Sequence, residues 1–205
     1  VVGCLKDLIA QPDNCPPYCF VWTSTQGFEL ESKNPDKRVV GTEMLFSILE
    51  YPEQITADPD PAYAMNLFLK EHIPYAFVLG LDSITEHMKR ATEDEPILYV
   101  RIADIVTDRL TFGIAWMKCT MAIHIIAPDS SSRSKWTRVV LNSIVQSGET
   151  LMPDESVMLF DSARANNTFD YLATGQITLG TTFSIPRTSN LGDPAAPALR
   201  NTKIH

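Results

Sequence analysis

The residue types that could carry chemistry begin with the cysteines. Three of them, Cys4, Cys15 and Cys19, fall within the first nineteen residues, and Cys119 lies on an apolar stretch. The spacing of Cys15 and Cys19 matches no zinc signature, because no second pair of cysteines or histidines follows at ligand spacing. Cys119 is expected to be a small buried hydrophobe. The other three lie in a proline-rich segment expected at the surface, as free thiols or as crosslinks within or between subunits.

The histidines and acidic pairs do not form a catalytic arrangement in the sequence. His124 lies in the middle of a predicted strand, where a hydrogen-bonded or solvent-facing histidine is favoured over a general base. The remaining histidines, His72, His87 and His205, lie far apart on different elements. The acidic pairs, Asp58 with Asp60 and Asp154 with Glu155, stand beside prolines, where turns and helix starts explain them.

Sequence motifs add no chemistry to these residues. Phosphate loops, dinucleotide fingerprints, nucleophile elbows and paired zinc histidines do not occur, and the nine glycines are scattered. The sequence therefore predicts no catalytic, cofactor-binding or metal-binding residue, and a protein that is not an enzyme.

Size and composition limit the function classes further. The chain has 205 residues, of which 44% are hydrophobic, as expected for one domain with a single core. Its formal charge of −8 argues against tight, sequence-reading DNA binding, which depends on basic side chains. Without a long apolar run or a signal-like start, we expect a soluble protein with no targeting segment and no membrane partner.

The elements are expected to fall into three regions. Residues 1–41 predict an irregular N-terminal arm, 42–186 an α+β domain, and 187–205 an extended, proline-rich C-terminal tail. Two helices open the domain. One is a short helix that begins at Thr42 and stops at Pro52, and the other begins at Asp60 and Pro61 and ends before Pro74.

The period of the apolar residues then changes to two. Residues 75–81 predict a central strand covered on both faces, and 83–92 a short helix or a long loop. Residues 97–106 and 114–127 predict a long hairpin, and Ile177–Ile185 a half-buried strand. The strongest helix, Arg133–Ser147, has Trp136, Val140 and Ile144 on its apolar face and ends at Gly148. The expected fold is an antiparallel or mixed sheet with packed helices.

The order of elements between about Arg109 and Arg187 resembles the tail terminator proteins of tailed bacteriophages. It consists of a hairpin, the strand Cys119-Thr-Met-Ala-Ile-His-Ile-Ile-Ala127, the turn Pro128-Asp-Ser-Ser-Ser, the helix with Trp136, and the alternating strand Gly175–Ile185. The resemblance implies a ring of identical subunits, usually a hexamer, that caps the tail tube and joins it to the head. It also implies residence in the virion after assembly in the host cytoplasm.

The same resemblance implies partners but no catalytic residues. The partners would be other copies of the chain, proteins of the tail tube or sheath, and head-to-tail connector proteins, with DNA only passing non-specifically through the ring. Three alternatives stay open. They are another neck or head-completion connector subunit, a non-viral α+β binding module, and an enzyme whose catalytic groups are dispersed in the sequence. The first hundred residues have no counterpart in the resemblance.

Overall fold

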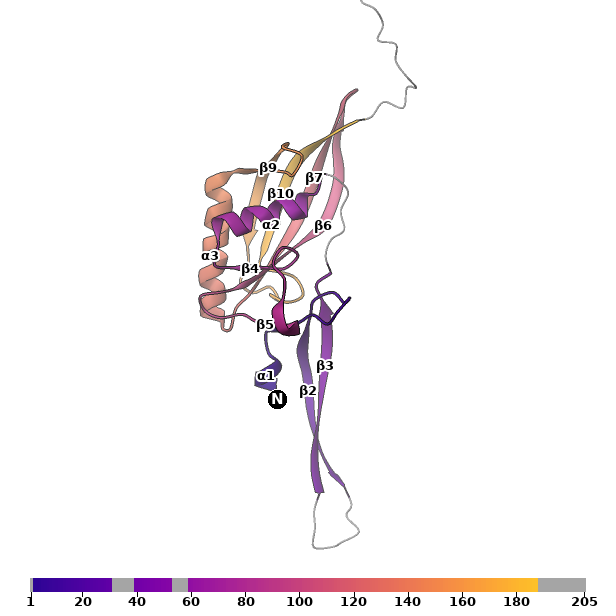
Figure 1. Cartoon of the computed structure of the whole chain (residues 1–205), viewed down its shortest axis with the longest axis vertical. Coiled ribbons are helices and arrows are strands. Elements are labelled where there is room, and N and C mark those ends of the chain that lie inside the picture. Colours follow the sequence, from indigo (N-terminus) through magenta and orange to yellow (C-terminus); the bar gives the residue numbers. More distant parts are fainter. Residues whose placement is uncertain (1, 31–38, 53–58, 188–205) are drawn as a thin grey trace, which may run out of the picture.

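The chain folds around two β-sheets with helices on one side (Figure 1). The computed structural model describes residues 2–30, 39–52 and 59–187. A six-stranded sheet has the order β4-β6-β7-β10-β9-β8, and a four-stranded sheet has the order β3-β2-β1-β5. All neighbours pair antiparallel except β4 and β6, so the larger sheet is mixed and the fold class is α+β.

The elements have the following bounds in chain order: α1 Val2–Leu5, β1 Leu8–Ala10, β2 Tyr18–Leu30, β3 Val39–Glu50, α2 Pro61–His72, β4 Phe77–Val78, a 3₁₀ turn Thr85–His87, β5 Met88–Arg90, β6 Ile97–Leu110, β7 Ile114–Ile126, α3 Ser130–Ser147, β8 Glu149–Leu151, β9 Val157–Ala165 and β10 Ile177–Pro186.

The two longer helices are fixed by local capping. Asp60 precedes α2 and accepts a 2.9 Å hydrogen bond from the Tyr63 amide, while Asp129 precedes α3 and accepts one of 2.9 Å from the Ser132 amide. Gly148 ends α3 with a φ of 71°, a backbone conformation that favours glycine. The helices predicted after Asp60 and over Arg133–Ser147 are confirmed, and α3 begins three residues before the predicted Arg133 because Asp129 is its cap.

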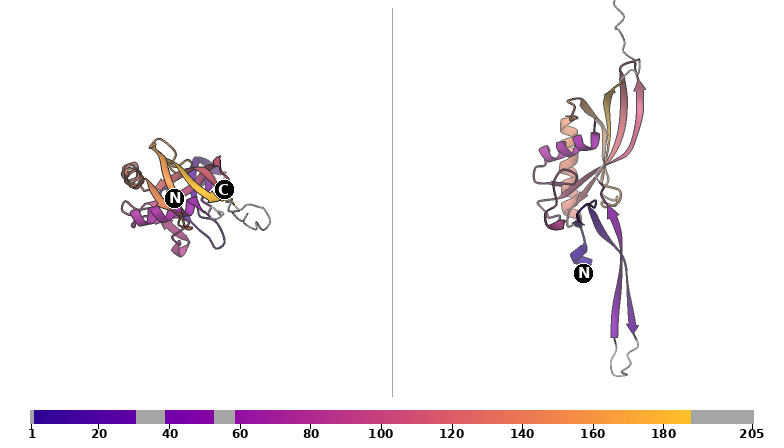
Figure 2. Two further views of the ribbon diagram at one scale, coloured as in Figure 1. Left: turned by 90° about the horizontal axis from the view of Figure 1, so that it is seen from above. Right: turned by 45° about the vertical axis from the view of Figure 1, so that its right-hand side comes forward.

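Both helices lie on the same face of the six-stranded sheet (Figure 1, Figure 2). The main core fills the space between them and the inward face of β7 and β10. Trp136, Val140 and Ile144 of α3 are buried there, as the sequence predicts. The Trp136 indole N–H also donates a 2.8 Å hydrogen bond to the Glu93 carbonyl, which ties the helix to the loop before β6.

A second core lies on the opposite face of the same sheet. It contains Ile97 and Tyr99 of β6 together with Ile126 of β7, and it packs against Ile9 and Cys19 of the smaller sheet. Because side chains alternate across a strand, the neighbouring Leu98 and Val100 belong to the main core. This end of the six-stranded sheet is therefore covered on both faces.

The strand predicted over residues 75–81 is shorter and placed differently. Only Phe77 and Val78 form β4, which lies at the edge of the sheet, so the predicted central position is wrong. The expectation of cover on both faces is confirmed, since Phe77 packs in the second core and Val78 in the main one. Residues 85–90 form a 3₁₀ turn and the short strand β5, which pairs with β1.

The first fifty residues differ most from expectation. The predicted irregular arm contains β2, and the predicted helix after Thr42 is β3, so the two segments form one long antiparallel hairpin from Tyr18↔Glu50 to Leu30↔Val39. The apolar residues Met44, Leu45, Ile48 and Leu49 fit a helical stripe, but pairing with β2 decides the conformation. Residues 188–205 of the predicted tail lie outside the described residues.

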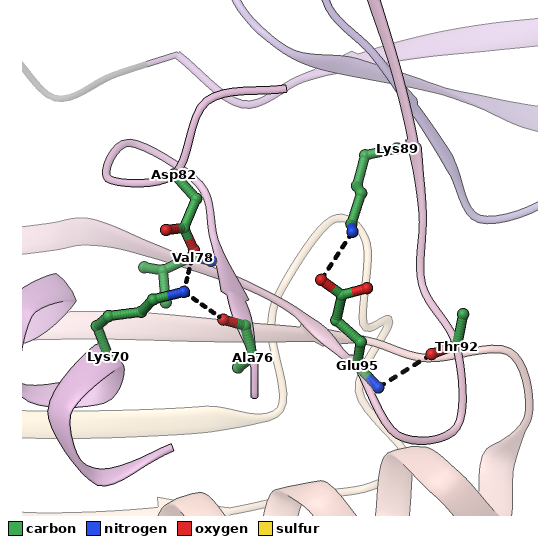
Figure 3. Close-up of polar contacts among 7 residues, drawn as sticks. All are labelled: Lys70, Ala76, Val78, Asp82, Lys89, Thr92 and Glu95. Atoms are coloured by element: carbon green, nitrogen blue, oxygen red, sulfur yellow. Dashed lines mark hydrogen bonds and ion pairs between the residues drawn. The ribbon is translucent and has the colours of Figure 1, made fainter. Parts of the chain in front are cut away.

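Two ion pairs hold the loops around β4 and β5 (Figure 3). Lys70 near the end of α2 contacts Asp82 at 2.7 Å and also donates to the Ala76 carbonyl at 3.0 Å. Asp82 in turn accepts from the Val78 amide at 2.8 Å. Lys89 and Glu95 contact each other at 2.7 Å. The end of α2, β4 and the turn after it are thus held together by one polar network.

Candidate functional site

Two long hairpins project from opposite ends of the body (Figure 2). The hairpin β2–β3 leaves the end where β1 and β5 lie, and the distal parts of β6 and β7 extend beyond the helices at the other end (Figure 1). We call these the lower hairpin, residues 18–30 with 39–50, and the upper hairpin, residues 102–118.

The lower hairpin exposes apolar side chains on both of its faces. The exposed set consists of Trp22, Phe28, Val39, Val40, Leu45 and Ile48. An isolated two-stranded hairpin is only marginally stable in water, and a long exposed apolar strand is a site of association. Strand β3 is moreover an edge strand, so its outer backbone groups have no partner strand among the described residues. This hairpin has the properties of an assembly element.

An aromatic ring contacts the facing strand within the lower hairpin. The Phe28 ring lies directly over Gly41 on the facing strand, where a Cβ atom would come within 2.4 Å of the ring. Gly41 is therefore required for this close approach, and the aromatic ring covers the backbone that the glycine leaves open.

The upper hairpin ends in an apolar tip. Leu110, Phe112 and Ile114 are exposed there, and Phe112 is 84% exposed. The Arg187 amide donates to the Gly113 carbonyl at 2.9 Å, so the residue that follows β10 contacts the tip. Ile105 and Val106 of β6 are also exposed. Such a projecting apolar tip suits insertion against another chain.

Tyr51 anchors the lower hairpin to the body. Its side chain is buried, and its hydroxyl donates a 3.3 Å hydrogen bond to the Leu172 carbonyl. The Cys19 Sγ lies 3.4 Å from the same hydroxyl, and the Tyr99 ring packs edge-on at 5.0 Å. Burial raises the pKa of the Tyr51 hydroxyl well above its ordinary value. The hydroxyl therefore serves as a neutral hydrogen-bonding group at the base of the hairpin.

His124 lies beside this anchor and is buried, with 1% of its surface exposed. The Arg101 Nε donates to His124 Nε2 at 3.1 Å, and His124 Nδ1 lies 3.1 Å from the Tyr171 carbonyl. Since an arginine N–H can only donate, the imidazole proton belongs on Nδ1 and is donated to that carbonyl. Burial lowers the pKa of His124 to about 4, outweighing the bond to the Tyr171 carbonyl, which raises it.

The position of His124 confirms one of the two predicted environments. The side chain is hydrogen-bonded and neutral, but it lies in the interior and not on a polar face. The other described histidines are distant from it: His72 contacts the Phe68 carbonyl and Ser147, and His87 contacts the Gln11 carbonyl. His205 lies outside the described residues.

The cysteines are all free. Cys119 is buried in the main core, as predicted. Cys19 is buried as well, so its predicted place on the surface is wrong; the pairing of β2 with β1 carries it into the second core. Cys4 and Cys15 are exposed. Burial raises the pKa of Cys119 to about 11, which leaves it an inert thiol at neutral pH.

The described members of the predicted acidic pairs stabilise a helix start and a turn. Asp60 caps α2, and Asp154 accepts hydrogen bonds from the Ser156 amide and hydroxyl in a turn. Asp58 lies outside the described residues. Within residues 2–30, 39–52 and 59–187, no three acidic, histidine or cysteine side chains are grouped as a metal site would require.

The helices of the described segments are too short or too polar to cross a membrane.

The sequence was compared with models of known protein families and with curated proteins, and neither comparison finds a match.

Proposed function

We propose that this chain is a structural subunit of a ring of identical copies, of the kind that caps a phage tail tube and joins it to the head. The observation that carries the proposal is the pair of long hairpins at opposite ends of one body, each with exposed apolar side chains. A folded domain with two buried cores gains nothing from such projections by itself. Contacts with neighbouring chains would bury them.

The placement of the hairpins suits a head-to-tail ring. Rings form when one surface of a subunit meets a different surface of the next, and the rotation closes. The lower and upper hairpins are different surfaces at different ends, so each can meet a neighbour without blocking the other. They can also reach the rings above and below, which in this proposal belong to the tail tube or sheath and to the connector.

The charge of the lower hairpin supports a place beside passing DNA. Residues 18–50 carry five acidic side chains, Glu29, Glu31, Asp36, Glu43 and Glu50, against three basic ones, Lys33, Lys37 and Arg38. This acidic excess and the net charge of −8 of the chain disfavour tight binding of phosphates. A surface of this sign lets a duplex pass without being held.

The test is the mass of the assembly as protein concentration rises. Light scattering and negative-stain images should show rings, six subunits being the expected number, for the full chain. Val40, 70% exposed on β3, would be replaced by lysine to place a charge in the proposed contact. Val40→Lys should keep the fold and shift the mass toward the monomer.

A matched control uses Val145, which is 68% exposed and belongs to α3 and so to neither hairpin. Val145→Lys makes the same chemical change and should leave the rings intact. A monomer at every concentration, or equal loss of rings in both variants, would contradict the ring proposal. Rings that bind a purified connector and not a tail tube would favour another neck role.

A further inference from the structure

A small cavity lies between α2 and the second core, next to Tyr51 at the base of the lower hairpin. Its volume is about 230 Å³. The side chains that matter for its chemistry are Tyr51, Asp60, Tyr63, Asn66 and Tyr99, with the Gly80 turn closing one side. This is smaller than the range of about 300 to 1,000 Å³ for sites that take drug-sized molecules. It suits a group the size of one amino-acid side chain.

Asn66 is the first sign of a ligand. It is 8% exposed, and its Oδ1 atom has no hydrogen-bond partner in the described part of the chain. Its neighbours on the inward side of α2, Met65 and Leu69, are fully buried and apolar. A leucine would fill such a position without an unpaired polar atom, so the amide oxygen is costly unless a donor reaches it.

Asp60 is the second sign. One carboxylate oxygen caps α2, and burial nevertheless raises the pKa of this carboxyl, because removal from water outweighs the bonds from the Tyr63 and Ala62 amides. None of the ion pairs among the described residues includes Asp60. Lys70, the basic residue of α2, is held instead by Asp82 and the Ala76 carbonyl (Figure 3).

The tyrosines complete the cavity as aromatic walls. The Tyr99 hydroxyl donates to the Pro52 carbonyl at 2.8 Å, and the Tyr51 hydroxyl donates to the Leu172 carbonyl. Their rings, packed edge-on with centroids 5.0 Å apart, are therefore fixed in position. Aromatic rings attract cations through their negative faces. An acceptor amide, a half-buried carboxylate and aromatic walls together select a cation that carries N–H donors.

We propose that the cavity binds an alkylguanidinium or alkylammonium group, whose N–H groups donate to Asn66 Oδ1 and to the Asp60 carboxylate. The same chemistry is offered by a small free cation and by an arginine or lysine side chain of another copy of the chain. The inference does not depend on the proposed ring, because it rests on α2 and the second core alone.

The full chain is titrated with ethylguanidinium and with propylammonium. Binding is monitored through the side-chain amide signals of Asn66 in nuclear magnetic resonance spectra. Asn66→Leu identifies those signals by their loss. Uncharged ethylurea is the control ligand, since it offers donors without charge. We expect the two cations to shift the Asn66 signals with saturation and ethylurea to shift them about tenfold more weakly or not at all.

Two variants separate binding from folding. Asn66→Leu removes the acceptor and should abolish cation binding, while its melting temperature is unchanged or raised because the unpaired oxygen is gone. Asp60→Ser keeps a residue that can cap α2 and should weaken binding about tenfold or more. Asp129→Ser makes the same change at the cap of α3, outside the cavity, and should bind as the unaltered chain does.

Equal binding of ethylguanidinium and ethylurea, or unchanged cation binding in Asn66→Leu, would overturn the proposal. The affinity for ethylguanidinium, measured at several protein concentrations, distinguishes the two sources of the natural group. If the apparent affinity for ethylguanidinium falls as the chain self-associates, a basic side chain of a second copy occupies the cavity. If the affinity stays constant, the cavity takes a free cation.

Discussion

The Nε atom of Arg101 donates a hydrogen bond to Nε2 of His124 across 3.1 Å, between the adjacent strands β6 and β7. This contact requires the buried imidazole to be neutral at that nitrogen. A protonated His124 would place two donors against each other and a charge in the second core. The pair therefore links the stability of the fold to pH.

Stability should fall in mild acid because of His124. Its pKa is about 4 in the folded chain against an ordinary value of 6.5, so the unfolded state binds more protons between these values. The stabilisation is full above pH 6.5 and is lost as pH falls toward 4. Between pH 7 and pH 4.5 this histidine alone should cost about 2.5 kcal/mol of unfolding free energy. Urea unfolding at a series of pH values measures it.

The controls for this pH dependence are two glutamine variants. His124→Gln cannot titrate and should be less stable at pH 7 but lose much less stability in acid. His87→Gln changes an exposed histidine and should keep the full dependence. A His124→Gln protein with the original pH profile would show that another group is responsible.

Removal of the Tyr51 anchor should loosen the lower hairpin. Tyr51→Phe deletes the hydroxyl bonded to the Leu172 carbonyl and should cost about 1 kcal/mol. Tyr51→Ala also empties a buried aromatic site and should cost about 3 to 5 kcal/mol. Amide hydrogen exchange in β2 and β3 should accelerate more than in β7 and β10. Equal costs for the two variants would mean that the ring does not anchor the hairpin.

Gln176 should be essential for the pairing of β7 with β10. Its Oε1 accepts from the Ile125 amide and its Nε2 donates to the Ile125 carbonyl, both at 2.8 Å, so the side chain extends the strand pairing that starts at Ile177↔Ile123. Gln176→Met leaves two buried backbone groups unpaired and should cost about 2 kcal/mol or more in denaturant unfolding. Gln146→Met, on the exposed side of α3, should change stability by less than about 0.5 kcal/mol.

Trp136 should contribute more to folding than the exposed Trp22. Trp136→Ala empties a buried aromatic site and removes the bond to the Glu93 carbonyl, at a cost of about 3 to 5 kcal/mol. Trp22→Ala, on the lower hairpin, should cost far less under conditions where the chain is monomeric. Thermal unfolding of the two variants compares them. Similar melting temperatures would mean that the apolar face of α3 is not part of the core.

The sequence by itself determined the elements whose signals are local. The start of α2 at Asp60 and Pro61, the cap of α3 at Asp129 and its end at Gly148 follow from side chains bonded within one turn. The alternation of apolar and polar residues over β10 also predicts this strand correctly, because one of its faces is more buried than the other. In these segments the local preference and the tertiary environment favour the same conformation.

Only the tertiary structure decided the lower hairpin and the cavity. The strands β2 and β3 are apolar on both faces and their apolar residues lack a period of two, so no local signal distinguishes them from an arm or a short helix. The hairpin is selected by the hydrogen bonds between the two strands, which join residues up to 32 positions apart in the sequence. The cavity likewise combines Asn66 of α2 with Tyr51 and Tyr99, which lie on other elements. An unpaired amide oxygen is a property of the folded surroundings, and no spacing in the sequence encodes it.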